Sequence, residues 1–255
     1  MLLAIDVGNT NIVMGGITEG KIDFIARTST DRIKTDAQYG IQIKNILELY
    51  NVDINRIKGC VISSVVPPVL NALKGAVELV TGCKPLIVGP GVKTGLNILM
   101  DNPAAVGSDL IVNAVAALNE YKPPLIIIDM GTATTISVVD EKKNYIGGCI
   151  MPGIKTSLDA LSARAAQLPE ISLEDPKNII GKNTVDCMRN GFVYGNAAML
   201  DGYIERIEEQ LGKCTTIITG GLSRFIVPHC KKSMIYSEDL LLKGLYVIYN
   251  MNKSK

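Results

Sequence analysis

The chain has 255 residues, of which 47% are hydrophobic, so it can bury one large core or two smaller ones. Its 26 Lys and Arg residues nearly balance 25 Asp and Glu residues, and it has no basic block interleaved with aromatic residues, which argues against a nucleic-acid partner. Trp is absent and aromatic residues make up 5% of the chain, so no stacking platform for bases is visible. This composition favours a globular protein that acts on small molecules.

The cysteines and the N-terminus indicate the compartment. The six cysteines never take the C-x₂-C spacing of zinc or redox sites, so we expect reduced core residues at 60, 83, 149, 187, 214 and 230. The first residues lack the positive region of a signal peptide, and Asp6 interrupts their apolar run. No segment has the length of a membrane span. The sequence therefore predicts a cytoplasmic protein without membrane contact.

The first half of the chain begins with strands. In chain order it predicts strands near 2–7, 11–17 and 21–27, a helix near 35–50, a strand at CVISSVV, a helix near 67–81 and a strand at PLIVG. The string GGITEGKI resembles a P-loop, but Ile22 replaces the required Ser or Thr, so we interpret it as a turn between two strands. Asn102 and Pro103 predict the cap and first turn of a helix through VGSDLIVNAVAALNEY that crosses between the halves.

The second half repeats this order. It predicts strands near 125–129, 133–140 and 144–150, helices near 153–167 and 184–211, a strand at TTIITGG, a helix, a short strand near SMIY and a last helix at LLLKGLYVIYN. We interpret His229 as a loop or helix-end residue, since no triad or metal set includes it. The chain is thus predicted to contain two unequal copies of one unit, 1–115 and 116–255.

Two similar turns anchor this repeat. DVGNTN begins at Asp6 and DMGTAT begins at Asp129, each between two apolar runs. Glycine in such a turn permits a positive φ and close approach to a ligand, and Thr and Asn offer hydrogen-bond donors to a phosphate. A carboxylate beside a phosphate requires a cation between them. One such turn alone would be interpreted as an ordinary hairpin, but two of them indicate a metal–nucleotide cleft.

The pattern of three strands, a helix and alternating strand and helix, present twice, resembles the acetate and sugar kinase, Hsp70 and actin superfamily. This resemblance implies an α/β fold of duplicated ribonuclease-H-like (actin-like ATPase) domains, each a mixed five-stranded sheet flanked by helices. Because that superfamily also contains chaperones, hydrolases and filaments, the fold alone does not establish function.

Local strings narrow the resemblance to type III pantothenate kinases, over nearly the whole chain. They are DVGNTN (6–11), STDRIKTDAQYG (29–40), ISSVVPPV (62–69), LIVGPGVKTG (86–95), DNPAAVGSDL (101–110), DMGTATT (129–135), GGCIMPGIKTSLDAL (147–161), GKNTVDCMRNG (181–191) and TGGL (219–222). The resemblance implies transfer of the γ-phosphate of ATP to the hydroxyl of pantothenate. It also implies Mg²⁺, a monovalent cation (K⁺ or NH₄⁺) and a homodimer.

The same resemblance assigns roles to residues of this chain. Asp109 matches the catalytic carboxylate that accepts the proton of the attacking hydroxyl, and Asp129 matches the K⁺ position. Nucleotide binding falls on Asp6, Val7, Gly8, Asn9, Thr10, Asn11, Ile12, Val13 and Thr132, with Asp6 also a Mg²⁺ ligand. Acceptor binding falls on Met100, Gly107, Ser108, Asp109, Leu110 and Thr184.

Two of these residues also have simpler structural interpretations, and two positions differ from the family's strings. Asp109 alone would be read as a solvated helix acid, and Thr184 could cap the helix that follows it. The family's Tyr and Arg are replaced here by Met100 and Leu110, which removes a hydroxyl and five guanidinium donors from the acceptor side. Two alternatives therefore stay open: a kinase for another small hydroxylated acceptor, and a non-catalytic nucleotide-binding regulatory relative.

Overall fold

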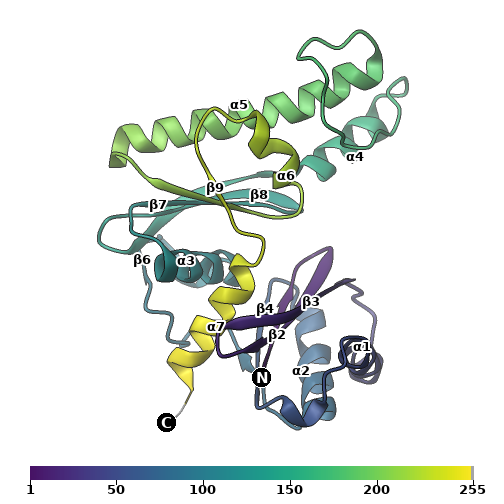
Figure 1. The fold of residues 1–255 in the computed structure, drawn as a ribbon, viewed down its shortest axis with the longest axis vertical. Coiled ribbons are helices and arrows are strands. Elements are labelled where there is room, and N and C mark those ends of the chain that lie inside the picture. Colours follow the sequence, from purple (N-terminus) through teal and green to yellow (C-terminus); the bar gives the residue numbers. More distant parts are fainter. Residues whose placement is uncertain (254–255) are drawn as a thin grey trace. The chain divides into compact units, whose positions relative to one another are not determined.

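The computed structural model describes residues 1–253 and divides into two compact units (Figure 1). Unit 1 comprises Met1–Leu96, Asp101–Asn119 and the C-terminal segment from Asp239. Unit 2 comprises Asn97–Met100 and Glu120–Glu238. The units are therefore discontinuous in sequence. The division into halves 1–115 and 116–255 concerns the internal repeat, and it remains a prediction.

Unit 1 is a mixed five-stranded sheet with the strand order β3-β2-β1-β4-β5. Its strands are β1 (Leu2–Val7), β2 (Asn11–Thr18), β3 (Lys21–Ser29), β4 (Gly59–Ser64) and β5 (Leu86–Ile87). Its helices are α1 (Asp36–Leu49), α2 (Pro67–Thr81), α3 (Ser108–Glu120) and α7 (Leu240–Asn252), with short 3₁₀ helices η1 (Ile54–Arg56) and η2 (Pro103–Ala105). β1 pairs antiparallel with β2 and parallel with β4, so the carboxyl ends of β1 and β4 meet at one edge.

Alternating and continuous apolar runs explain this sheet. β1 and β4 read LLAIDV and GCVISS and are buried on both faces, as central strands between helices should be. Their side chains pack with those of α1 and α2, and Tyr39 of α1 is fully buried in this core. Between β2 and β3, Glu19 (φ 51°) and Gly20 (φ 83°) form the tight turn, which confirms our interpretation of the GGITEGKI string.

Unit 2 has the sheet order β11-β10-β7-β8-β9-β6. The strands are β6 (Asn97–Ile98), β7 (Leu125–Met130), β8 (Ala133–Val139), β9 (Asn144–Pro152), β10 (Thr215–Thr219) and β11 (Ile235–Tyr236). The helices are α4 (Ile154–Arg164), α5 (Thr184–Leu211), α6 (Ser223–Ile226) and the 3₁₀ helix η3 (Val227–His229). One apolar core joins β7, β8 and β10 to α4, α5 and α6, and α5 runs along the sheet in Figure 1.

The two mixed sheets flanked by helices confirm the predicted fold class, with one addition. The two-residue strand β6 pairs parallel with β9 and makes the second sheet six-stranded. Asn97 donates from Nδ2 to Oδ1 of Asn144 over 2.7 Å at this pairing. So short a strand carries no periodic signal in the sequence.

The start of α3 differs from prediction, whereas α5 begins at residue 184 as predicted. Pro103 opens the short η2 instead of α3, Asn102 makes no side-chain cap bond, and extended backbone at Val106 separates η2 from α3, which begins at Ser108. At α5 the capping side chain is that of Asn183, which accepts from the backbone N–H of Asp186, so Thr184 is the first helical residue and not the cap.

The cysteines are only partly as expected. All six are free, and Cys60 is buried. Cys187 is exposed and the other four are partly buried, so the prediction that all are core residues is wrong. Burial raises the pKa of the Cys60 and Cys230 thiols to about 12, which keeps both protonated at neutral pH.

Candidate active site

The first of the two Asp-x-Gly turns, DVGNTN from Asp6, lies at the carboxyl end of β1. We call it the first turn, and DMGTAT from Asp129 the second turn. Asp6 is paired in register with Ser63 of β4 and with Val13 of β2. The N–H of Gly8 donates to the carbonyl of Asn11 over 2.9 Å. From outside the turn, Thr30 donates its hydroxyl to the carbonyl of Gly8 over 2.7 Å. The turn is therefore fixed by backbone bonds and by a second loop.

The second turn, between β7 and β8, is built in the same way. The N–H of Gly131 donates to the carbonyl of Ala133 over 3.0 Å, and Asp129 lies in register with Thr219 of β10. The carbonyl of Thr132 accepts from the N–H of Gly153 over 3.0 Å and from the Thr156 hydroxyl over 2.8 Å. The start of α4 thus fixes the backbone of Thr132.

The glycines of these turns serve differently from prediction. Gly8 and Gly131 do not adopt a positive φ, so that expectation is wrong. A Cβ on Gly8 would lie 3.2 Å from the carbonyl oxygen of Asn11, a tight contact that would push the turn open by a few tenths of an ångström. Around the second turn, a Cβ on Gly153 would collide with the carbonyl oxygens of Gly131 and Thr132.

Gly220, directly after β10, is the glycine with a true left-handed conformation at this site. Its φ is 96°, and an added Cβ would lie 2.5 Å from the carbonyl oxygen of Met130. Gly220, Gly153 and Thr156 were not predicted as site residues from the sequence, although they lie within the strings TGGL and GGCIMPGIKTSLDAL. The sequence feature that could have indicated the two glycines is a glycine at or just after the end of a predicted strand, which occurs in both strings.

Asp109 lies in the first turn of α3, at the edge where β1 and β4 end. The hydroxyl of the neighbouring Ser108 lies 2.9 Å from the Ser63 hydroxyl and 3.2 Å from the Ser64 carbonyl oxygen. Because Ser63 is paired with Asp6, these bonds bring the start of α3 to the same sheet edge as the first turn. Unit 1 thus places two candidate carboxylates at one edge.

The Asp109 carboxyl is partly desolvated. Burial raises its pKa above the ordinary value of 3.8, while hydrogen bonds from the backbone N–H groups of Leu110 and of Asp109 itself oppose the shift. A Cβ on Gly107 would lie 2.5 Å from Oδ1 of Asp109, so a side chain at residue 107 would displace the carboxylate from this position. A raised pKa makes this carboxylate a stronger base than an ordinary aspartate.

The acceptor-side residues fall in both units. Gly107, Ser108 and Leu110 accompany Asp109 in unit 1, whereas Met100 and Thr184 belong to unit 2. Met100 is 38% exposed, and its sulfur lies 3.6 Å from where a Cβ on Gly147 would be. Thr184 is exposed at the start of α5.

The described residues contain no group of three or more His, Cys, Asp and Glu side chains able to hold a metal ion. A lone carboxylate such as Asp6 still fits Mg²⁺, because this ion is commonly held by one or two carboxylates together with substrate phosphates and water. His229 ends η3 as expected, and its Nε2 lies 2.7 Å from Oδ1 of Asp175. Within residues 1–253, no helix is both long and apolar enough to span a membrane.

Solved structures share this fold at low sequence identity. They include a conserved Baf family protein from Campylobacter jejuni (TM-score 0.62, 18% identity, 98% of each chain covered). Component A of the (R)-2-hydroxyglutaryl-CoA dehydratase from Acidaminococcus fermentans matches with a TM-score of 0.57 and 14% identity, over 97% of this chain and 96% of that one. The fold and its two Asp-Gly turns define an actin-like ATPase and sugar kinase fold.

Sequence comparison then identifies the family. The model of the type III pantothenate kinase family matches residues 2–206. Type III pantothenate kinases from an Exiguobacterium species and from Bacillus cytotoxicus are 46% and 47% identical over 253 residues, covering 99% of this chain and 100% and 97% of theirs. The chain belongs to the type III pantothenate kinase family and is an ATP-dependent kinase.

Proposed function

We propose that this kinase transfers the γ-phosphate of ATP to the hydroxyl of pantothenate, with Asp109 as the base. The observation that carries the proposal is the bonding of Ser108 to Ser63 and Ser64, which holds Asp109 at the sheet edge where β1 ends, next to Asp6. Phosphoryl transfer requires positioning, charge neutralisation and a group that takes the hydroxyl proton as attack proceeds. Asp109, with its raised pKa, suits that last task.

The two turns bind the nucleotide in this proposal. Residues 6–13 and Thr132 contact the phosphates through backbone N–H groups and short polar side chains. Asp6 takes Mg²⁺, which neutralises phosphate charge when bound. Asp129 takes the monovalent cation, K⁺ or NH₄⁺, on the basis of family resemblance. Gly107, Ser108, Leu110, Met100 and Thr184 contact the acceptor.

The decisive experiment follows ADP release by the purified chain with MgATP and pantothenate, with K⁺ and then with Na⁺ as the monovalent cation. We expect turnover that needs K⁺ and that falls at least about 100-fold in Asp109→Asn. The matched control is Asp159→Asn, which removes an exposed carboxylate of α4. Unchanged turnover in Asp109→Asn would contradict the role of Asp109.

A kinase for another acceptor remains the second candidate, since Met100 and Leu110 replace the family's Tyr and Arg. Restoring one charge-assisted hydrogen bond strengthens binding by about 10- to 100-fold. If wild type is silent with pantothenate and Met100→Tyr with Leu110→Arg restores turnover, the acceptor pocket is adapted to another alcohol. If both proteins are silent, a regulatory nucleotide-binding role is favoured.

We also propose a cytoplasmic homodimer. Six free cysteines suit a reducing compartment. In unit 2, Ile150, Ile179 and Ile180 expose 73%, 68% and 77% of their surface. The adjacent Ile179 and Ile180 are the residues that we expect the second copy of the chain to cover.

A further inference from the structure

The loop Thr30–Thr35, between β3 and α1, lies against the first turn and has no assigned role. The N–H of Thr30 donates to the carbonyl of Thr10 over 2.9 Å, and its hydroxyl donates to the carbonyl of Gly8. These bonds connect the loop to both sides of Asn9. The position of the loop is therefore tied to the position of the turn.

The rest of the loop is fixed by hydrogen bonds to residues of α1. The hydroxyl of the fully buried Tyr39 accepts from the N–H of Asp31 over 3.2 Å and donates to the carbonyl of Asp31 over 2.5 Å. Thr35 and Gln38 form a reciprocal capping box at the start of α1. A loop fixed at residues 30, 31 and 35 presents its intervening side chains in defined directions.

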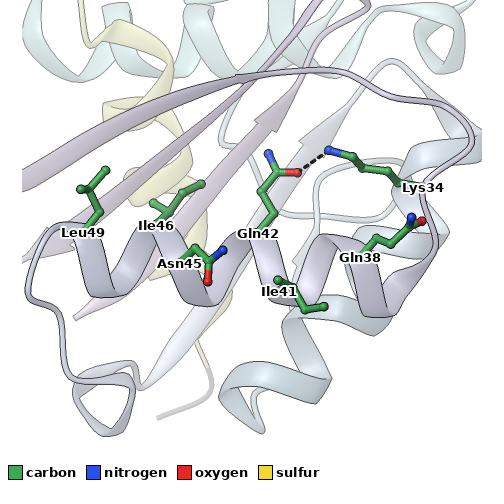
Figure 2. A pocket seen from close by; sticks show the side chains of 7 residues that line it. All are labelled: Lys34, Gln38, Ile41, Gln42, Asn45, Ile46 and Leu49. Carbon is green, nitrogen blue, oxygen red and sulfur yellow. Dashed lines mark hydrogen bonds between the residues drawn. The ribbon is translucent and has the colours of Figure 1, made fainter.

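The two cations of this loop point to different partners. Nη2 of Arg32 donates to Oδ1 of Asn9 in the first turn over 3.1 Å. Nζ of Lys34 instead donates to Oε1 of Gln42 over 2.9 Å, beside a pocket of about 320 Å³ on the surface of α1 (Figure 2). Arg32 is thus the cation that the loop delivers to the turn.

This placement supplies what the turn lacks. Residues 6–13 contain the carboxylate of Asp6 and no Lys or Arg. A guanidinium has five N–H donors, and the bond to Asn9 uses one of them. By accepting this bond on Oδ1, the Asn9 amide directs its nitrogen, with two donors, away from Arg32.

From this arrangement we infer that Arg32 is a phosphate-binding residue of the nucleotide site and that it also orients the amide of Asn9. The inference rests on the proposed nucleotide role of residues 6–13. Its ligand is the polyphosphate of ATP, because a planar guanidinium recognises phosphate oxygens through paired hydrogen bonds. The adenosine part of the nucleotide has no share in it.

The test measures binding by calorimetry, with a non-hydrolysable ATP analogue plus Mg²⁺ and with adenosine as the phosphate-free probe. We expect Arg32→Gln to weaken the ATP analogue about 10- to 100-fold and to change adenosine binding less than twofold. Arg32→Lys should fall in between, because it keeps the charge and loses the fork. Lys34→Gln is the matched control and should leave both ligands within twofold of wild type.

A second arm tests the orientation of Asn9. Asn9→Ala and Arg32→Gln should be non-additive in the affinity for the ATP analogue, because each removes the same contact. The inference is overturned if Arg32→Gln weakens the affinity for the ATP analogue and for adenosine equally. It is also overturned if the affinity for the analogue falls less than twofold. These results are separable from turnover: a chain silent with pantothenate that still shows the Arg32 effect keeps this inference and loses the proposed acceptor.

Discussion

At the scale of single residues, the proposed base Asp109 is expected to lower the stability of the fold at neutral pH. Its pKa is higher in the folded protein than its ordinary value of 3.8, so the folded state binds this proton more tightly than the unfolded state. Folding stability from this group therefore falls as pH rises from 3.8 through the raised pKa. We predict that Asp109→Asn raises the melting temperature at pH 7, whereas the gain disappears near pH 3. A lower melting temperature at pH 7 would contradict this.

If Asp109 is the base that we propose, its pKa also sets the acid limb of the activity profile. Because the base must be ionised, kcat should fall as pH decreases through the raised pKa, and the midpoint should lie above 3.8. The measurement is kcat against pH at saturating ATP and pantothenate, with melting curves at each pH to exclude unfolding. An acid limb with its midpoint at or below 3.8 would show that another group limits the rate.

Gly220 shows how a single missing Cβ supports the second turn. Its φ of 96° and the Met130 backbone 2.5 Å from an added Cβ leave no room for a side chain. We predict that Gly220→Ala lowers the free energy of unfolding by about 1–3 kcal/mol. Gly191→Ala, at an exposed position of α5 where an added Cβ meets nothing within 4 Å, should instead stabilise the fold by up to about 1 kcal/mol. Chemical denaturation of both variants makes the comparison.

At the scale of elements, the cap of α5 lies next to Thr184, which we propose as an acceptor-binding residue. Asn183 accepts from the N–H of Asp186 over 2.9 Å and donates to its carboxylate over 2.7 Å, directly before Thr184. Asn183→Ala should cost about 1 kcal/mol of stability and raise the KM for pantothenate, with little effect on the KM for ATP. Asn183→Ser, which keeps a capping oxygen, should restore most of both. An equal rise in both KM values would indicate a general loss of structure.

At the scale of the whole molecule, the proposed dimer can be tested by mass. Sedimentation equilibrium at micromolar concentration should give twice the 27.4 kDa of one chain. Ile179→Lys with Ile180→Lys should shift the protein towards one chain, because burying two lysines in an apolar interface is costly. Leu79→Lys on exposed α2 of unit 1 is the control. If the wild-type protein has the mass of one chain, the proposal of a homodimer is wrong.

Sequence patterns predicted most elements because their signals are local. The apolar runs of β1, β4 and β7 and the 28-residue α5 were recognisable from periodicity. The bounds of α5 agree with the predicted 184–211, whereas the start of α3 was assigned incorrectly, because Pro103 is compatible with a helix start but opens only the short η2. The candidate site residues could be named from the sequence strings. The pKa of Asp109 could not, because it depends on how deeply the folded chain buries the carboxyl group.

By itself, the sequence determined the two Asp-Gly turns, the order of strands and helices and the family, since these are properties of short strings and their spacing. Only the tertiary structure decided that Gly8 does not adopt a positive φ, that the Asp109 pKa is raised and that Arg32 contacts Asn9. The physical reason is that these features arise from contacts and desolvation between residues far apart in the chain. Arg32 and Asn9 are separated by 23 positions, and Ser108 and Ser63 by 45.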